Sequence, residues 1–150
     1  MRLMVAAVVA FALVLAGCGQ TSQADRMKAV VRAMNADVNA GRFVAAARLL
    51  SLPVRISFIG PEAQDGCYCR TAADLAHLNA QLPCSATIMS ITVRGRNATA
   101  VLGLHDKPTS TCDAPPGSRT AVQFTIVHGK ITASKQLWVQ PSGGAPISGG

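Results

Sequence analysis

The chain has 150 residues with a formal net charge of +7, and 49% of the residues are hydrophobic. This length allows one domain and excludes a large multidomain protein. The basic residues are scattered with no run that would bind a nucleic acid, so we expect no nucleic-acid partner and, at most, attraction to anionic surfaces such as lipid headgroups.

Residues 1–17 have the pattern of a secretory signal peptide. Arg2 supplies the positive start, and an unbroken apolar run from Leu3 to Ala16 follows. The run is shorter than the roughly 20 residues of a membrane-spanning helix. Its last residues, Leu15-Ala16-Gly17-Cys18, resemble the lipobox of bacterial lipoproteins. That resemblance implies a diacylglyceryl group on the Cys18 sulfur, further acylation (palmitate), and cleavage before Cys18.

The predicted location follows from this anchor. The acyl chains on Cys18 would attach the protein to the outer membrane or to the outer face of the cell membrane, exposed to an oxidising extracytoplasmic space. Two alternatives stay open: an ordinary signal peptide in which Cys18 is incidental, and a short transmembrane anchor.

Four cysteines remain after acylation: Cys67, Cys69, Cys84 and Cys112. An even number in an exported chain predicts two disulfides, with three connectivities open. We expect no metal and no cofactor, because paired zinc ligands are usually separated by two to four residues and Cys67 and Cys69 by one. The predicted hairpins favour Cys84–Cys112, although Cys67 and Cys69 would then be free or joined in a small strained ring.

The predicted domain spans residues 25–140, between a polar tether (18–24) and a low-complexity, disordered tail (141–150). Apolar periodicity predicts helices from about Ser22 or Asp25 to Val38, from Phe43 to Leu50, and from a Thr71 cap to Leu82. Alternation and turn residues predict strands at 54–58, 67–69, 86–93, 98–105, 120–127 and 130–139. The result is an α+β fold with two or three N-terminal helices packed on a curved, mostly antiparallel sheet.

Two stretches carry a family resemblance. Met34 to Ala46 resembles the end of the first helix and the entry to the second in the nuclear transport factor 2-like (NTF2-like) superfamily, which includes SnoaL and ketosteroid isomerase-like proteins. Ile126 to Ile131 resembles the last hairpin of that family, where an acidic residue usually stands in place of His128. The resemblance implies a cone-like fold with a pocket open at one end. It does not decide between catalysis and binding.

The predicted concave face is almost free of ionisable groups. Period-two counting from a Gly95-Arg96 turn places seven side chains inward: Met89, Ile91, Val93, Ala98, Ala100, Leu102 and Leu104. The same counting from a His128-Gly129 turn places Val122, Phe124, Ile126, Ile131, Ala133, Leu137 and Val139 inward, and Gln123, Thr125, Thr132, Ser134 and Gln136 outward. Asp106 is then the one inward acid of the strands and Lys135 the one inward base.

Only two residues are candidates for acid–base chemistry. Asp106 ends its strand on the inward face, where it is either a pocket carboxylate or a solvated residue. His77 lies beside the apolar face of the third helix, where it is either catalytic or a partly buried structural histidine.

The sequence favours a non-enzymatic, membrane-anchored domain of the cell envelope that binds an apolar small molecule, a lipid or an envelope protein. One alternative is a small isomerase- or cyclase-type enzyme that uses Asp106 or His77. Another is a domain that serves as a spacer or assembly subunit.

Overall fold

The computed structural model describes residues 21–59 and 66–148, so the predicted signal peptide and Cys18 lie outside it. The helices are α1 (Gln23–Asn39), α2 (Phe43–Arg48) and α3 (Ala72–Gln81). The strands are β1 (Leu50–Ser57), β2 (Cys67–Cys69), β3 (Cys84–Arg94), β4 (Asn97–Asp106), β5 (Arg119–Val127), β6 (Lys130–Gln140) and β7 (Ile147–Ser148). None of the helices in these ranges combines the length and the apolar character needed to cross a bilayer.

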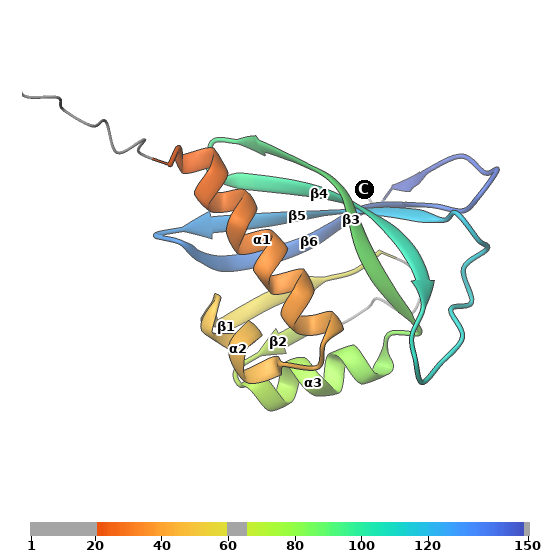
Figure 1. Cartoon of the computed structure of the whole chain (residues 1–150), viewed down its shortest axis with the longest axis horizontal. Helices are drawn as coiled ribbons and strands as arrows, with labels where there is room; N and C mark the ends of the chain where they lie inside the picture. Colours follow the sequence, from red (N-terminus) through yellow and green to blue (C-terminus); the bar gives the residue numbers. More distant parts are fainter. Residues whose placement is uncertain (1–20, 60–65, 149–150) are drawn as a thin grey trace, which may run out of the picture.

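The strands form one curved sheet in the order β2-β1-β6-β5-β4-β3, with β7 beside β6. Among the strands of the described residues, β1 and β6 run parallel to each other and the other neighbours are antiparallel. Helix α1 crosses the face of the long strands, while α2 and α3 lie next to β1 and β2 (Figure 1). The predicted α+β architecture of three helices on a curved, mostly antiparallel sheet is confirmed.

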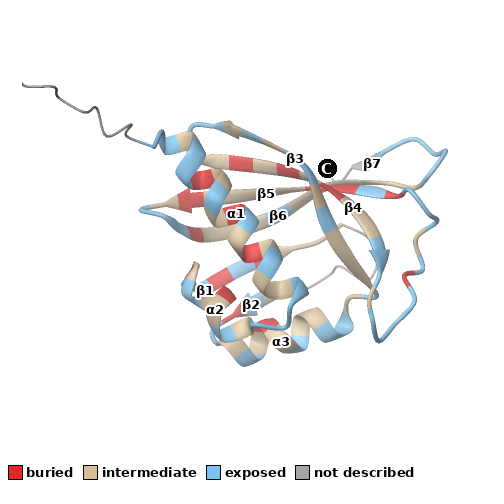
Figure 2. Cartoon of the chain, in the orientation of Figure 1, coloured by how far each residue is buried: buried red, intermediate tan, exposed pale blue. Residues whose placement is uncertain are grey.

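Helix α1 begins and ends where local chemistry favours it. The Ser22 hydroxyl oxygen accepts a hydrogen bond from the Asp25 backbone N–H at 3.0 Å, which satisfies one free donor of the first turn. Gly41 follows the helix with a φ of 69°, a conformation that glycine adopts without steric cost. Met27, Val31 and Met34 recur at spacings of four and three and are buried against the sheet (Figure 2).

The Thr71 cap predicted for α3 is present as a complete capping box. The Thr71 side chain accepts a bond from the Asp74 N–H, and the Asp74 carboxylate accepts one from the Thr71 N–H. The Arg70 N–H donates to the same carboxylate at 2.7 Å and is the main cause of the lowered pKa of Asp74. Leu75 is then buried in the core.

Both hairpin turns have the predicted register. Arg94 pairs with Asn97 around Gly95-Arg96, and Val127 pairs with Lys130 around His128-Gly129. His128 and Gly129 both have positive φ, at 49° and 73°, as a type I′ hairpin turn requires.

Because of three β-bulges, part of the predicted assignment of side chains to the inward and outward faces is wrong. Each extra residue reverses which side chains face inward in the rest of the strand. In β3 the pairing skips Met89, which is 53% exposed, and Ile88 faces inward instead. In β6 the pairing skips Thr132 and then Leu137. Between these two bulges Gln136 points inward and Lys135 is exposed, the reverse of the prediction.

The chain forms one more short strand after β6. Ile147 and Ser148 form β7 and pair with Val139 and Trp138 of β6. Pro141 and Gly144 form a turn that returns the chain to the sheet, through a hydrogen bond from the Gly144 N–H to the Pro141 carbonyl.

The bulge in β3 can be tested with two adjacent substitutions. We expect Ile88→Ala to lower the free energy of unfolding by about 2 kcal/mol, because it removes partly buried methyl groups that pack against the core. Met89→Ala is the matched control and should change it by less than about 0.5 kcal/mol. Urea unfolding measures both. A larger cost for Met89→Ala than for Ile88→Ala would place the bulge elsewhere.

Candidate functional site

A cavity of about 340 Å³ lies between α1, α3 and the concave face of the sheet. Its wall is mainly apolar, formed by Val31, Met34, Val38, Ile56, Phe58, Leu75, Leu78, Leu82, Pro83, Ala86, Ile88, Leu102, Leu104, Val122 and Phe124. Asn39 and Pro83 also line it and are exposed, so the cavity reaches the surface near the C-terminal ends of α1 and α3.

Among the described residues, no Asp, Glu, Lys, Arg or His side chain lines this cavity. The polar lining consists of neutral groups: Asn35, Asn39, Asn79, Ser85, Thr120 and Gln136. Transfer of an unpaired charge from water into such a space is strongly unfavourable, whereas an apolar group gains free energy on entry. The wall therefore suits an uncharged, mostly apolar molecule.

Some of the polar groups are already committed to the protein. The Gln136 amide donates to the Thr120 hydroxyl at 2.9 Å and accepts from the Ile59 backbone N–H at 2.9 Å. The Thr120 hydroxyl donates onward to the Trp138 carbonyl at 2.8 Å. The Asn39 amide donates to the Ala86 carbonyl at 2.8 Å and so links the end of α1 to β3.

Two carboxamides remain for a ligand. Within residues 21–59 and 66–148, the side chains of Asn35 and Asn79 make no hydrogen bond, and both line the cavity while being partly buried. A carboxamide both donates and accepts, so this pair can bind a hydroxyl, carbonyl or ester oxygen.

The structure places neither predicted catalytic candidate at this cavity. The Asp106 carboxylate is exposed at the end of β4 and accepts a hydrogen bond from the Cys112 N–H at 2.7 Å, which orders the following loop. His77 is exposed on α3, where its Nε2 lies 3.1 Å from the Gln81 side-chain nitrogen. His77 instead lines a separate surface groove with Tyr68 and Arg70.

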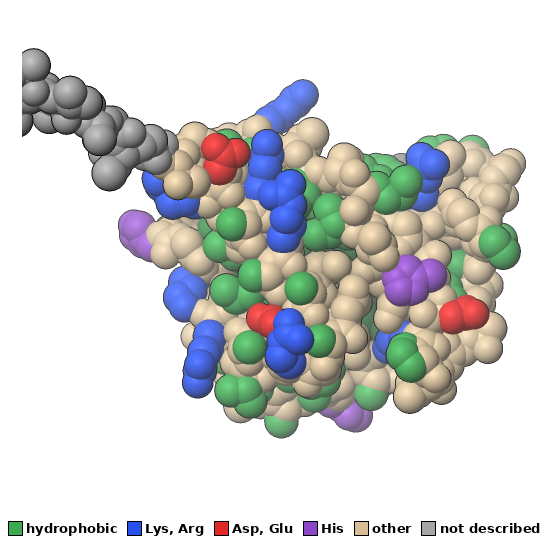
Figure 3. Space-filling model, in the orientation of Figure 1, with side chains coloured by type: hydrophobic (Ala, Val, Ile, Leu, Met, Phe, Trp, Pro, Cys, Tyr) green, Lys and Arg blue, Asp and Glu red, His purple; other side chains and the backbone are tan. Residues whose placement is uncertain are grey.

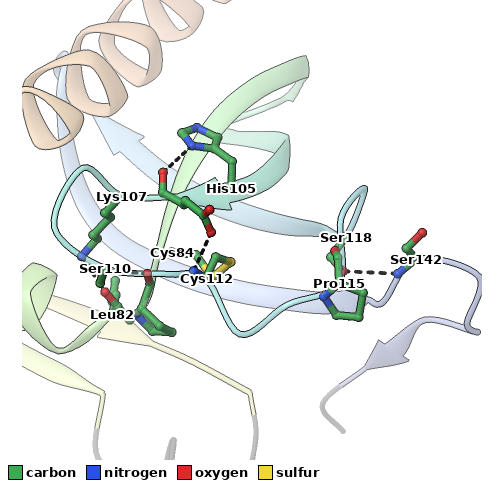
Figure 4. The surroundings of a disulfide bond; sticks show 11 residues. Leu82, Cys84, His105, Lys107, Ser110, Cys112, Pro115, Ser118 and Ser142 are labelled. Atoms are coloured by element: carbon green, nitrogen blue, oxygen red, sulfur yellow. Dashed lines mark hydrogen bonds between the residues drawn. A yellow bond between two sulfur atoms is a disulfide. The ribbon is translucent and has the colours of Figure 1, made fainter.

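A disulfide and several hydrogen bonds tie the loop after β4 to the end of α3 and the start of β3 (Figure 4). Cys84, which lines the cavity, is bonded to Cys112 in the loop after β4. The Lys107 ammonium group donates to the carbonyls of Asn79 and Leu82 at the end of α3, and its burial lowers the pKa of this amine. Helix α3 has no basic residue in its last turn, so Lys107 supplies the cation that a helix C-terminus favours.

All four predicted disulfide cysteines are paired. The bonds are Cys84–Cys112, which the sequence favoured, and Cys67–Cys69, which closes the small ring that had made this connectivity less favourable. Two disulfides are consistent with an oxidising extracytoplasmic location. No cluster of potential metal ligands occurs in the described part of the chain.

The sequence interpretation missed the polar lining. Asn35 and Asn39 follow Val31 at successive spacings of four, so the helical pattern did contain a signal for them. Gln136 had no such signal, because only the bulge at Thr132 turns it inward.

Known structures share this fold at low sequence identity. A protein from Kribbella flavida provisionally assigned as a ketosteroid isomerase matches with a TM-score of 0.58 and 18% identity, over 84% of this chain and 85% of its own. A protein of unknown function with a cystatin-like fold from Methylobium petroleophilum has a TM-score of 0.64 and 16% identity, over 81% and 80%. An NTF2-like protein of unknown function from Cytophaga hutchinsonii has a TM-score of 0.54 and 14% identity, over 78% and 92%.

The fold is therefore the NTF2-like cone. No protein-family model matches the sequence, and no curated protein matches it significantly. At these identities the structural matches establish the fold and leave the function to the site itself.

The two disulfides should differ in their contribution to stability. Replacing both Cys84 and Cys112 by Ser should lower the free energy of unfolding by about 3 kcal/mol, because that bond closes a long loop in the unfolded chain. The Cys67→Ser/Cys69→Ser variant should lose about half as much, because its ring is short. Denaturant unfolding of the oxidised proteins measures both. An equal loss would contradict the loop-length argument.

Proposed function

We propose that this protein is a membrane-anchored lipoprotein of the cell envelope whose cavity binds an uncharged, mostly apolar small molecule. The observation that carries the proposal is the cavity wall, which is apolar and has no ionisable side chain among the described residues. Its volume of about 340 Å³ lies within the range of roughly 300 to 1,000 Å³ that is typical of small-molecule sites.

The two free carboxamides define the ligand further. Asn35 on α1 and Asn79 on α3 offer donors and acceptors to one neutral oxygen function, such as an alcohol, ketone or ester. A carboxylate is disfavoured because no cation among residues 21–59 and 66–148 lines the cavity to neutralise it. The proposed ligand is thus an apolar body with one neutral polar group.

The membrane anchor is supported by sequence and by redox chemistry. The segment Leu15–Cys18 has the order of residues that acylation requires, and the described domain begins a few residues later at the Ser22 cap. Two disulfides favour an exported protein.

The enzymatic alternative has weaker support. An isomerase or cyclase mechanism needs a titratable side chain within reach of the ligand. Asp106 and His77 both lie outside the cavity wall, so neither reaches a molecule bound there in this conformation.

Displacement of a neutral fluorescent probe tests the binding proposal. N-phenyl-1-naphthylamine should bind the purified protein with enhanced emission, and 1-decanol should displace it at a concentration at least about tenfold lower than decanoate does at pH 8. Asn35→Leu and Asn79→Leu should each weaken decanol binding about five- to tenfold, which corresponds to one hydrogen bond.

Gln81→Leu is the matched control for these variants, because Gln81 lies on α3 outside the cavity wall. It should leave the affinity for decanol unchanged. Absence of probe binding to the unsubstituted protein would refute the proposed function. Equal affinity for decanol and decanoate would refute the proposed ligand class.

The anchor has its own test in Cys18→Ser. This variant should no longer stay with membranes after a wash in 1 M salt, because its acyl chains are missing. The Cys67→Ser/Cys69→Ser variant, which keeps Cys18, should remain in the washed membrane fraction. Cell fractionation and the intact mass of the purified protein provide the readout. A Cys18→Ser protein that stays with washed membranes at its processed size would rule out the anchor.

A further inference from the structure

Cationic side chains that are far apart in the sequence meet at one end of the cone. Helix α1 contributes Arg26 and Lys28 from its first turns, and the β3–β4 turn contributes Arg94 and Arg96. Lys130, after the β5–β6 turn, is not part of this group, because its ammonium group donates to the Arg48 carbonyl at the end of α2. Arg26, Lys28, Arg94 and Arg96 are called the basic end below. Basic side chains gather around the start of α1 in the space-filling view (Figure 3).

The packing explains why they meet. The bond from Asn39 to the Ala86 carbonyl fixes the end of α1 beside the start of β3. From there, α1 back to its start and β3 forward to Arg94 both extend about 25 Å, so the start of α1 lies near the β3–β4 turn. The Ile126 N–H donates to the Arg96 carbonyl at 2.8 Å, which brings the β5–β6 turn to the same end (Figure 1).

This positive charge is poorly compensated. In the part of the chain that the structure describes, the one ion pair joins Arg42 and Asp37 at the other end of α1. Asp25 is the nearby acid of α1, and its carboxylate accepts a hydrogen bond from the Ser22 hydroxyl. Arg26, Arg94 and Arg96 are exposed.

The proposed anchor leaves from this same end. From Cys18 to Ser22 a chain spans at most about 14 Å, even when fully extended. An acyl group on Cys18 would therefore hold the basic end close to the bilayer, within about two screening lengths at physiological ionic strength. Anionic headgroups attract cations at this range.

We infer that the basic end is a docking surface for anionic lipid headgroups. It orients the anchored domain with α1 rising from the bilayer and the cavity mouth at the far end of that helix. The inference uses the proposed anchor for its proximity to the membrane. The attraction itself depends only on the folded domain.

Vesicle sedimentation of the unacylated protein tests this surface. The chain from residue 18 onward with Cys18→Ser should bind vesicles of phosphatidylcholine with 30% phosphatidylglycerol at 50 mM salt. It should not bind pure phosphatidylcholine. Replacing Arg26, Arg94 and Arg96 by Gln should lower the partition coefficient about 100-fold, since each cation near an anionic surface is worth about fivefold.

The control removes the same charge elsewhere. Arg55, Arg70 and Arg119 are exposed and lie away from the β3–β4 turn, and their replacement by Gln should lower the coefficient less than about fivefold. Equal losses in the two triple variants would overturn the docking surface in favour of net charge alone. Absence of binding to anionic vesicles, or binding that salt does not weaken, would overturn it as well.

Probe binding separates this inference from the proposed function. The Arg26→Gln/Arg94→Gln/Arg96→Gln variant should bind N-phenyl-1-naphthylamine as the unsubstituted protein does, because none of the three residues lines the cavity. Loss of vesicle binding with unchanged probe affinity supports the docking surface. Loss of both would show that the substitutions disrupt the fold. Vesicle binding of the three single-substitution variants would then test the docking surface.

Discussion

The absence of ionisable side chains from the described cavity wall constrains the rest of this domain. Its charged groups lie outside, while the apolar faces of α1, α3 and the sheet enclose a space that they do not fill. An unfilled apolar space costs stability, because the atoms that line it lack packing partners on one side. A ligand that occupied the space would restore those contacts, and its binding free energy would add to the stability of the folded state. Ligand affinity and fold stability therefore depend on the same surface.

A disulfide and hydrogen bonds hold the rim of the cavity in place, although the rim lies at the open end of the cone. Cys84 belongs to the wall and is joined covalently to the loop after β4, and the Lys107 ammonium group bonds the last carbonyls of α3. These links join the end of α3, the start of β3 and the loop into one unit. Because the rim is preorganised, binding needs little ordering of the chain and loses little affinity to it. Asp106, a candidate catalytic residue by sequence, contributes to this rim because its carboxylate accepts a hydrogen bond from the Cys112 N–H.

The elements set by local chemistry could be predicted, and those set by tertiary packing could not. The Thr71 capping box, Gly41 after α1 and the two hairpin turns depend on a few adjacent residues, and each was predictable. The bulges in β3 and β6 depend on how a curved sheet fits around α1. Neither Met89 nor Thr132 is a residue type that marks a bulge in a sequence. Each bulge reverses the faces beyond it, which moved Gln136 into the cavity and Lys135 out. The fold and the apolar nature of the site thus followed from sequence, while its polar contacts did not.

The two ends of α1 have opposite properties, and this opposition links anchoring to binding. The first turns carry Arg26 and Lys28 next to the proposed tether, whereas the last turns carry Asn35 and Asn39 at the cavity. Along the axis of this helix, Asn39 lies about 20 Å from Arg26. If the basic end rests on headgroups, the mouth opens toward the aqueous side, beyond the reach of lipids in the same leaflet. Ligand exchange must then occur through solution or through a partner that approaches the exposed mouth. That geometry is suited to capture of a molecule that passes the membrane surface and is poorly suited to extraction of lipid from the membrane that holds the protein.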